Sequence, residues 1–170
     1  MNLNRDDAFQ LFNELESKNF PNDVNVIIAP PSIYLDSFST ATNINIASQD
    51  VSSNDNGAFT GEFSSEMLSS LNLKYSIVGH SERRQYHHES DELIFHKTKK
   101  LIHQNISPLF CCGESLEERK SENHFNIVTS QLHKILNNLK PSDFEKIIIA
   151  YEPVWAIGTG LTAAPSDAQN

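Results

Sequence analysis

The sequence has little of what marks secreted, membrane or nucleic-acid-binding proteins. Its 170 residues carry a net charge of −9, whereas phosphate backbones are bound by basic surfaces, so nucleic acid is not an expected partner. Only two cysteines are present, the adjacent Cys111 and Cys112, and neighbouring strand positions point to opposite faces. We therefore expect buried thiols in a reducing compartment rather than a disulfide. No signal peptide and no bilayer-spanning apolar run is recognisable, so we expect a cytoplasmic protein with no membrane partner.

Hairpin signals, low-complexity tracts and obvious linkers are also lacking, and the length suits a single domain. Instead, about five short apolar segments alternate with helical patterns. Such alternation implies right-handed crossovers and a parallel sheet, which binds ligands at the carboxyl ends of its strands. The expected strands cover residues 24–29, 44–48, 75–78, 106–112 and 146–151.

Helices are expected before the first strand and between the strands, over residues 3–18, 32–42, 62–73, 91–103 and 115–139. Asn4 is placed to cap the first helix. Ser115 and Glu118 have the spacing of a capping box, and Pro141 is expected to end the helix that follows. The polar segment 49–60 is long for a connection within one domain, which favours a functional or interfacial loop over a merely mobile one.

The last expected strand ends on an acid. Residues 146–151 are Ile-rich without alternation, as in a strand buried on both faces, and Glu152-Pro153 cannot continue easily into a helix. Two glycines, Gly158 and Gly160, follow an apolar segment that could close over the acid. Glu152 is therefore interpreted as a catalytic base under a lid; the alternative is a solvated loop start before a common Gly-Thr-Gly turn.

An imidazole follows the strand at residues 75–78. His80 alone would more often be a hydrogen-bonded structural residue, but Glu82, Arg83 and Arg84 crowd the same turn, and Ser81 is expected to cap the next helix. A carboxylate facing an imidazole across the mouth of a parallel sheet suits proton transfer beside a carbonyl. The carboxylate removes a proton from carbon, and the imidazole polarises the oxygen that becomes negative.

These two stretches carry a resemblance to a known family. Gly79-His80-Ser81-Glu82-Arg83-Arg84 and Ala150-Tyr151-Glu152-Pro153-Val154-Trp155-Ala156-Ile157-Gly158-Thr159-Gly160 are long, specific motifs that resemble those of triosephosphate isomerase. Further matching stretches at family spacing are 29–31, 57–62, 89–93 and 112–119, so the resemblance runs nearly from end to end. It implies an α/β fold, the (β/α)8 TIM barrel, here incomplete as one partial domain over residues 1–170.

The resemblance also implies roles for individual residues. Glu152 would be the base and His80 the neutral electrophile, a pairing for which this enzyme family is itself the standard example. Glu82 would be a supporting acid, and Thr60 would reach into the partner subunit of a homodimer. The implied lid begins at residue 153 and extends to about residue 162, with the Gly158 N–H on the substrate phosphate. Its central residues are Pro153, Val154, Trp155, Ala156, Ile157, Gly158, Thr159 and Gly160.

The implied reaction interconverts dihydroxyacetone phosphate and glyceraldehyde 3-phosphate, in glycolysis and gluconeogenesis, without metal or organic cofactor. The sequence departs from the family in several places. The first barrel strand, with its Asn and catalytic Lys, and the last two strands have no counterpart. Asp50 stands where the family usually has Asn, and Leu161 stands where it usually has Lys.

Two other interpretations remain open from the sequence. One is a truncated, catalytically inactive paralogue that acts as an interaction module through residues 49–60. The other is a different phosphate-handling barrel enzyme, against which the length of the Glu152 motif argues.

Overall fold

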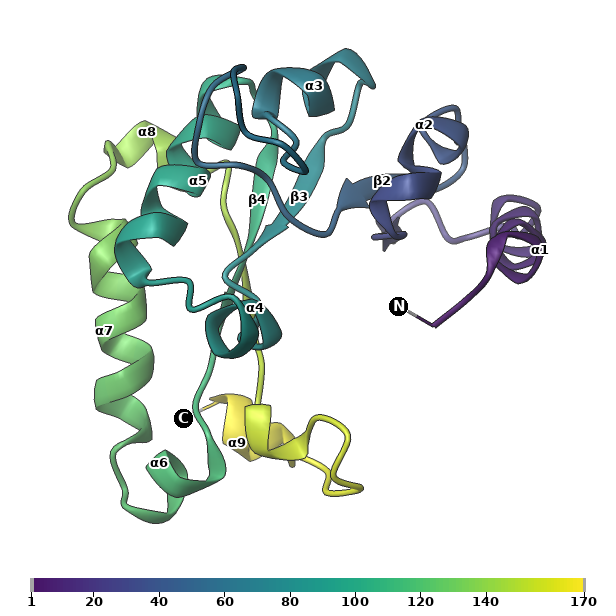
Figure 1. Ribbon diagram of the computed structural model, residues 1–170. Helices are drawn as coiled ribbons and strands as arrows, with labels where there is room; N and C mark the ends of the chain where they lie inside the picture. Colours follow the sequence, from purple (N-terminus) through teal and green to yellow (C-terminus); the bar gives the residue numbers. More distant parts are fainter. Residues whose placement is uncertain (1, 170) are drawn as a thin grey trace.

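The computed structural model describes residues 2–169 and shows helices alternating with strands of one curled sheet (Figure 1). The helices are α1 Arg5–Glu16, α2 Leu35–Phe38, α3 Ser65–Ser70, α4 Ser81–Tyr86, α5 Asp91–His103, α6 Leu116–Lys120, α7 His124–Leu136, α8 Pro141–Phe144 and α9 Pro165–Gln169, with short 3₁₀ helices at Ser32–Tyr34 and Val154–Ala156. The strands are β1 Ile27–Ile28, β2 Asn45–Ser48, β3 Tyr75–Val78, β4 Ser107–Cys112 and β5 Ile148–Tyr151. Within the described residues, no helix has the length and apolar character needed to cross a bilayer.

The five strands are all parallel and lie in the order β1-β2-β3-β4-β5. A doubly wound sheet reverses its strand order at a switch point, whereas a barrel adds each new strand beside the last. The sequential order and the curl of the sheet therefore confirm the prediction of an incomplete (β/α)8 barrel. Its carboxyl-terminal edge carries the two motifs singled out in the sequence.

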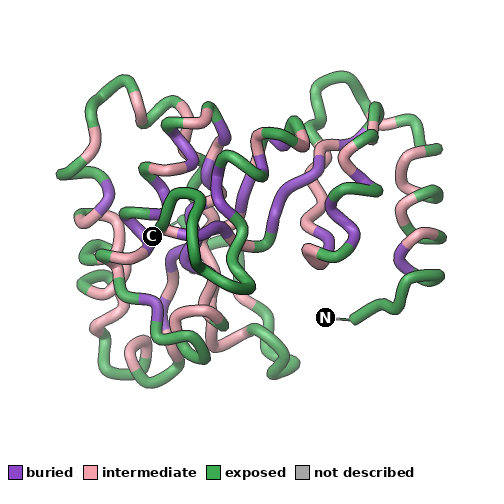
Figure 2. Tube along the Cα trace, turned by 45° about the horizontal axis from the view of Figure 1, so that its top comes forward, coloured by how far each residue is buried: buried purple, intermediate pink, exposed green. Residues whose placement is uncertain are grey.

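The core lies between the central strands and the helices that cover their outer face. Helices α5 and α7 lie side by side along β3 and β4 (Figure 1), and Val78, Ile94, Leu101 and Phe110 are at most 1% exposed. Burying side chains of this size contributes roughly 2 kcal/mol each. Figure 2 shows buried residues concentrated in this part of the chain, whereas α1 is mostly exposed. The centre of the sheet is thus the rigid part of the scaffold.

The first helix packs through aromatic rings. Phe12 stacks on Phe38 with ring centroids 4.2 Å apart, and Phe9 meets Phe38 edge-on at 5.0 Å. The predicted caps are confirmed at two helix starts: Asn4 accepts the Asp7 N–H, and Ser115 forms a capping box with Glu118.

Three predicted helices differ from the structure. The helix expected over residues 32–42 is one 3₁₀ turn followed by the four-residue α2, and the one expected over 62–73 shortens to α3. The single helix expected over 115–139 breaks between α6 and α7, where Glu122 takes a positive φ of 58°. Pro141 begins α8 at a position where its missing N–H costs nothing, and α7 has already ended.

Strand β5 is not buried on both faces as its composition suggested. It pairs with β4, and within the described residues it is the last strand of the sheet, so Ile148 and Ile149 remain 43% and 47% exposed. An Ile-rich segment predicts a strand with two apolar faces, but it does not show what covers them.

Gly113 allows β4 and β5 to end close together. The Glu152 N–H donates to the Cys112 carbonyl at 2.7 Å, and a Cβ placed on Gly113 would lie 1.8 Å from the Glu152 carbonyl oxygen. No side chain fits in that space, so the backbone itself requires glycine here.

We predict that Gly113→Ala lowers the free energy of unfolding by about 3 kcal/mol, because the ends of β4 and β5 must move apart to admit the methyl group. Chemical denaturation measures the loss. Gly57→Ala is the matched control, since its new Cβ meets only the edge of the exposed Phe59 ring, at 3.1 Å. Equal losses for both variants would contradict this account of Gly113.

Candidate active site

The structure brings together the two residues predicted to carry the chemistry. His80 lies two residues past β3 and Glu152 directly follows β5, so both stand at carboxyl ends of strands that flank β4. The imidazole Nε2 lies 3.0 Å from Glu152 Oε1, although the two residues are 72 positions apart in the chain. This distance is that of a hydrogen bond.

The surroundings of His80 determine which ring nitrogen carries the proton. Nδ1 accepts the backbone N–H of Glu82 at 3.3 Å, so Nδ1 presents a lone pair and Nε2 carries the hydrogen. A neutral imidazole of this tautomer donates through Nε2 to the Glu152 carboxylate. His80 therefore acts as the N-cap of α4, and the prediction that Ser81 caps this helix is wrong.

Ser81 has a different role, which the sequence did not suggest. Its backbone N–H donates to Glu152 Oε2 at 3.0 Å, while the imidazole occupies Oε1. Each carboxylate oxygen thus has one donor from the start of α4, and the Glu152 side chain is only 15% exposed. These bonds hold the acid in a defined orientation at the strand end.

Two hollows flank the pair. One of about 510 Å³ is lined by Glu152, Gly113, Val154 and other residues near the ends of β3 to β5. The other, of about 580 Å³, is lined by His80, Glu82 and Gln49. A side chain from α7 shapes the first hollow: Gln131 accepts the Gly113 N–H at 3.0 Å and donates to the Gly113 carbonyl at 3.1 Å. The carboxylate and the imidazole are thus both reachable from open space.

The segment after Glu152 is fastened at one point and open at its tip. Trp155 donates its indole N–H to Glu114 Oε1 at 2.9 Å, and Arg119 and Tyr151 bond to the same buried carboxylate. By contrast, Gly158 has a positive φ and nothing lies within 4 Å of the place where a Cβ would be. Trp155 is thus anchored to the buried Glu114, whereas Gly158 lies in open space.

Other predicted site residues lie nearby or on the surface. The Glu82 carboxylate is 68% exposed and lies 3.9 Å from His80 Nδ1, so it is at the rim of the pair. Thr60 and Leu161 are exposed, as is Gly158.

Both cysteines are free and buried, which confirms their prediction as packing residues, and burial raises the pKa of Cys112 to about 11.

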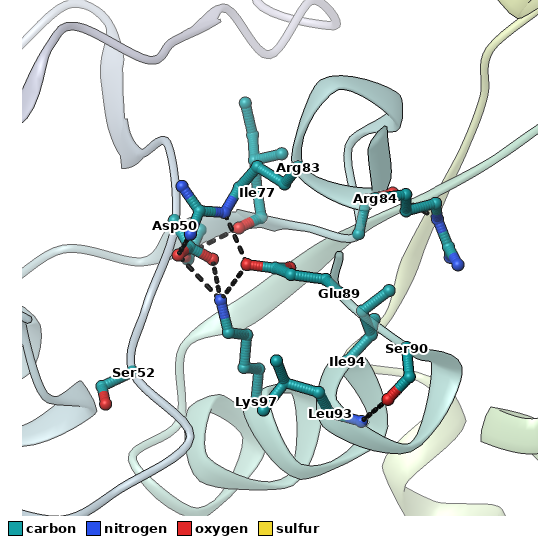
Figure 3. A network of polar contacts seen from close by, with 12 residues as sticks. Asp50, Ser52, Ile77, Arg83, Arg84, Glu89, Ser90, Leu93, Ile94 and Lys97 are labelled. Atoms are coloured by element: carbon teal, nitrogen blue, oxygen red, sulfur yellow. Dashed lines mark hydrogen bonds and ion pairs between the residues drawn. The ribbon is translucent and has the colours of Figure 1, made fainter. Parts of the chain in front are cut away.

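A network of buried and half-buried charges adjoins the start of α4 (Figure 3). Lys97 Nζ lies 2.7 Å from both Asp50 oxygens and 2.6 Å from Glu89 Oε1, and Arg83 bonds to Asp50 and to Glu89 at 2.8 and 2.7 Å. Burial tends to raise the pKa of Glu89, but the hydrogen bonds and charges of Lys97 and Arg83 outweigh it and hold that pKa below the usual value of 4.5. No local sequence pattern indicated this network.

The fold and this geometry define a (β/α)8-barrel protein whose site pairs a carboxylate with an imidazole. Comparison with known proteins agrees: the family model "Triosephosphate isomerase" matches residues 1–170. The chain is 46% identical over 151 residues to the triosephosphate isomerase of Cytophaga hutchinsonii, covering 88% of this chain and 60% of that protein. It is 41% identical over 174 residues to that of Porphyromonas gingivalis, covering 99% and 69%.

The chain belongs to the triosephosphate isomerase family. It spans between about half and two thirds of the length of these relatives; the enzyme of Cutibacterium acnes, 51% identical over 121 residues, is covered to 47%.

We predict that Glu89→Gln lowers the free energy of unfolding at pH 7 by about 2 kcal/mol, because it removes a charged acceptor from Lys97 and Arg83. Since the pKa of Glu89 is lower in the folded state, its contribution is present above pH 4.5 and is lost as pH falls through the folded value. Unfolding at a series of pH values measures this, with the exposed Glu117→Gln as control. A difference from the parent chain that stays constant down to pH 3 would contradict it.

Proposed function

We propose that the protein carrying this sequence is a triose-phosphate isomerase that interconverts dihydroxyacetone phosphate and D-glyceraldehyde 3-phosphate. One observation carries the proposal: His80 Nε2 and Glu152 Oε1 lie 3.0 Å apart, with Nδ1 occupied by a backbone donor. A base and a neutral hydrogen-bond donor side by side are what proton transfer next to a carbonyl requires. Membership of the family supports the same reaction.

The proposed reaction moves one proton between neighbouring carbons of the substrate and one proton between their oxygens. Glu152 removes a proton from the carbon beside the carbonyl, and the electron pair of that C–H bond moves to give an enediolate. The Nε2–H of His80 donates to the oxygen that becomes negative. Glu152, now protonated, returns the proton to the neighbouring carbon. His80 passes its Nε2 proton to the former carbonyl oxygen and takes up the proton of the neighbouring hydroxyl group, which gives the isomeric triose phosphate and restores both the carboxylate and the imidazole. No oxidant or reductant is needed, because the electrons stay within the substrate.

The same proposal assigns the surrounding residues. Residues 153–160 close over the substrate, with the Gly158 N–H on the phosphate, and the open space around Gly158 supports this movement. Glu82 supports the site from its rim.

For the quaternary structure and cellular setting we propose a homodimer in the cytoplasm that serves glycolysis and gluconeogenesis. Thr60, exposed at the end of the long polar segment, contacts the partner subunit. Nothing found favours the alternative of an inactive interaction module, and isomerase turnover by the purified protein distinguishes the two.

We predict that Glu152→Asp lowers kcat about 100-fold while KM changes much less, because the shortened side chain withdraws the base from hydrogen-bond reach of the substrate proton. Steady-state kinetics with both triose phosphates measures the effect. Glu117→Asp, an exposed acid on α6, serves as the control. Parent-like turnover of the Glu152 variant would remove Glu152 from its role.

His80→Gln is predicted to slow formation of the enediolate by about 100-fold or more, since it replaces the placed Nε2–H donor. The exchange of substrate protons with isotopically labelled solvent during turnover reports on this step. If the variant shows the same exchange profile as the parent protein, His80 is not the electrophile.

A further inference from the structure

Helix α4 carries His80 at its N-cap but has no hydrophobic anchor. None of its six residues is buried, so packing does not determine where it lies. Its side-chain attachments are two arginines. Arg84 donates to the carbonyls of Gly79 and Cys111 at 2.7 and 3.2 Å, and it pairs with Asp91 at 2.6 Å. Arg83 pairs with Asp50 and Glu89. The position of His80 therefore depends on polar bonds.

The two acids that hold Arg83 differ in what they attach it to. Glu89 lies six residues after Arg83, and its own backbone N–H donates to the Arg83 carbonyl, so it belongs to the same local segment. Asp50 lies two residues past β2 and comes from a distant part of the chain. Both acids also bond to Lys97 of α5, but of the two only Asp50 connects α4 to the segment that follows β2.

Asp50 is itself held firmly. Figure 3 shows Lys97 pointing toward Asp50 and Glu89, with Arg83 on the other side of the same carboxylates. Lys97 is 3% exposed and comes from α5, whose Ile94 and Leu101 are fully buried. Asp50 thus links α4 to a helix embedded in the core.

We propose that Asp50 is a positioning residue: acting through Arg83, it holds helix α4 and thereby places His80 against Glu152. An ionised carboxylate binds a guanidinium more strongly than an amide oxygen does, so the acid suits this role better than the Asn usual in the family. Burial raises the pKa of Asp50, and the negative charge of Glu89 raises it further. The positive charges of Lys97 and Arg83 lower this pKa, but they do not cancel the rise. Keeping Asp50 ionised at this position therefore costs free energy, as is common for residues that serve a functional site.

The test is backbone amide hydrogen exchange, followed by NMR, in the purified chain and in Asp50→Asn, which keeps the shape and removes the charge. Two amides report on the pair directly: Ser81 N–H donates to Glu152 and Glu82 N–H donates to His80. We expect both to exchange about tenfold faster in the variant, as for loss of one charge-assisted hydrogen bond, while the amides of β4 keep their rates. Unchanged rates at Ser81 and Glu82, or equal acceleration throughout β4, would overturn the proposal.

Two further variants make the result specific. Asp55→Asn removes the same charge from an 82% exposed partner of Lys100 and should leave both reporter amides unchanged. Arg83→Lys keeps the charge but cannot bridge both acids, and it should accelerate the same two amides. The double variant combines Asp50→Asn with Arg83→Lys. If its two reporter amides exchange at the rates of Arg83→Lys alone, Asp50 acts through Arg83. If the accelerations of the two single variants add, this route through Arg83 is refuted. If Asp50→Asn does not fold, the test rests on Arg83→Lys alone. Unchanged exchange rates at Ser81 and Glu82 in that variant would then overturn the proposal.

A kinetic measurement rests on the proposed function. If the protein is an isomerase, Asp50→Asn should lower kcat about tenfold with little change in KM, because substrate binding is kept while the donor is misplaced. Absence of turnover in the parent protein would refute the proposed function and leave the exchange test standing. Parent-like kcat in an active protein would refute the role of Asp50.

Discussion

The hydrogen bond between the His80 imidazole and the Glu152 carboxylate is the interaction around which the rest of the site is arranged. It joins residues from two strand ends with a third strand between them, so it exists only while β3, β4 and β5 keep their parallel register. Gly113 permits the close approach of β4 to Glu152, and Gln131 holds Gly113 from the helix side. The core beneath these strands therefore serves the site by fixing three backbone segments relative to one another.

At the start of α4, the side chains of His80 and Glu152 accept backbone N–H groups of the helix. A helix leaves its first N–H groups without intrahelical partners, and a cap residue usually accepts one of them. Here Ser81 N–H is taken by Glu152 and Glu82 N–H by His80. The bonds that complete the helix are thus the bonds that orient the acid and select the imidazole tautomer. Local structure and chemistry depend on the same few atoms at this point.

Much of this arrangement could be predicted from local sequence. Alternating strands and helices indicate a parallel sheet, and the positions of Glu152 and His80 at strand ends could be predicted because each follows an apolar strand within a long family motif. Asn4 and Ser115 act as caps because capping depends on residues three positions apart. What could not be predicted is non-local. The fit of Gly113 against Glu152 spans 39 positions (152 − 113), and the pairing of Asp50 with Lys97 spans 47. The exposure of β5 likewise could not be predicted, because it depends on which other segments pack against the strand, and the composition of the strand does not give them.

The most direct test of the central claim is the protonation pattern of the His80 ring, measured by ¹⁵N NMR of the purified chain at neutral pH. We expect a neutral ring in which Nε2 carries the proton and Nδ1 has the chemical shift of an unprotonated acceptor, because Nδ1 accepts the Glu82 N–H and Nε2 donates to Glu152. A ring protonated at Nδ1, either as the other tautomer or as the imidazolium, would contradict it.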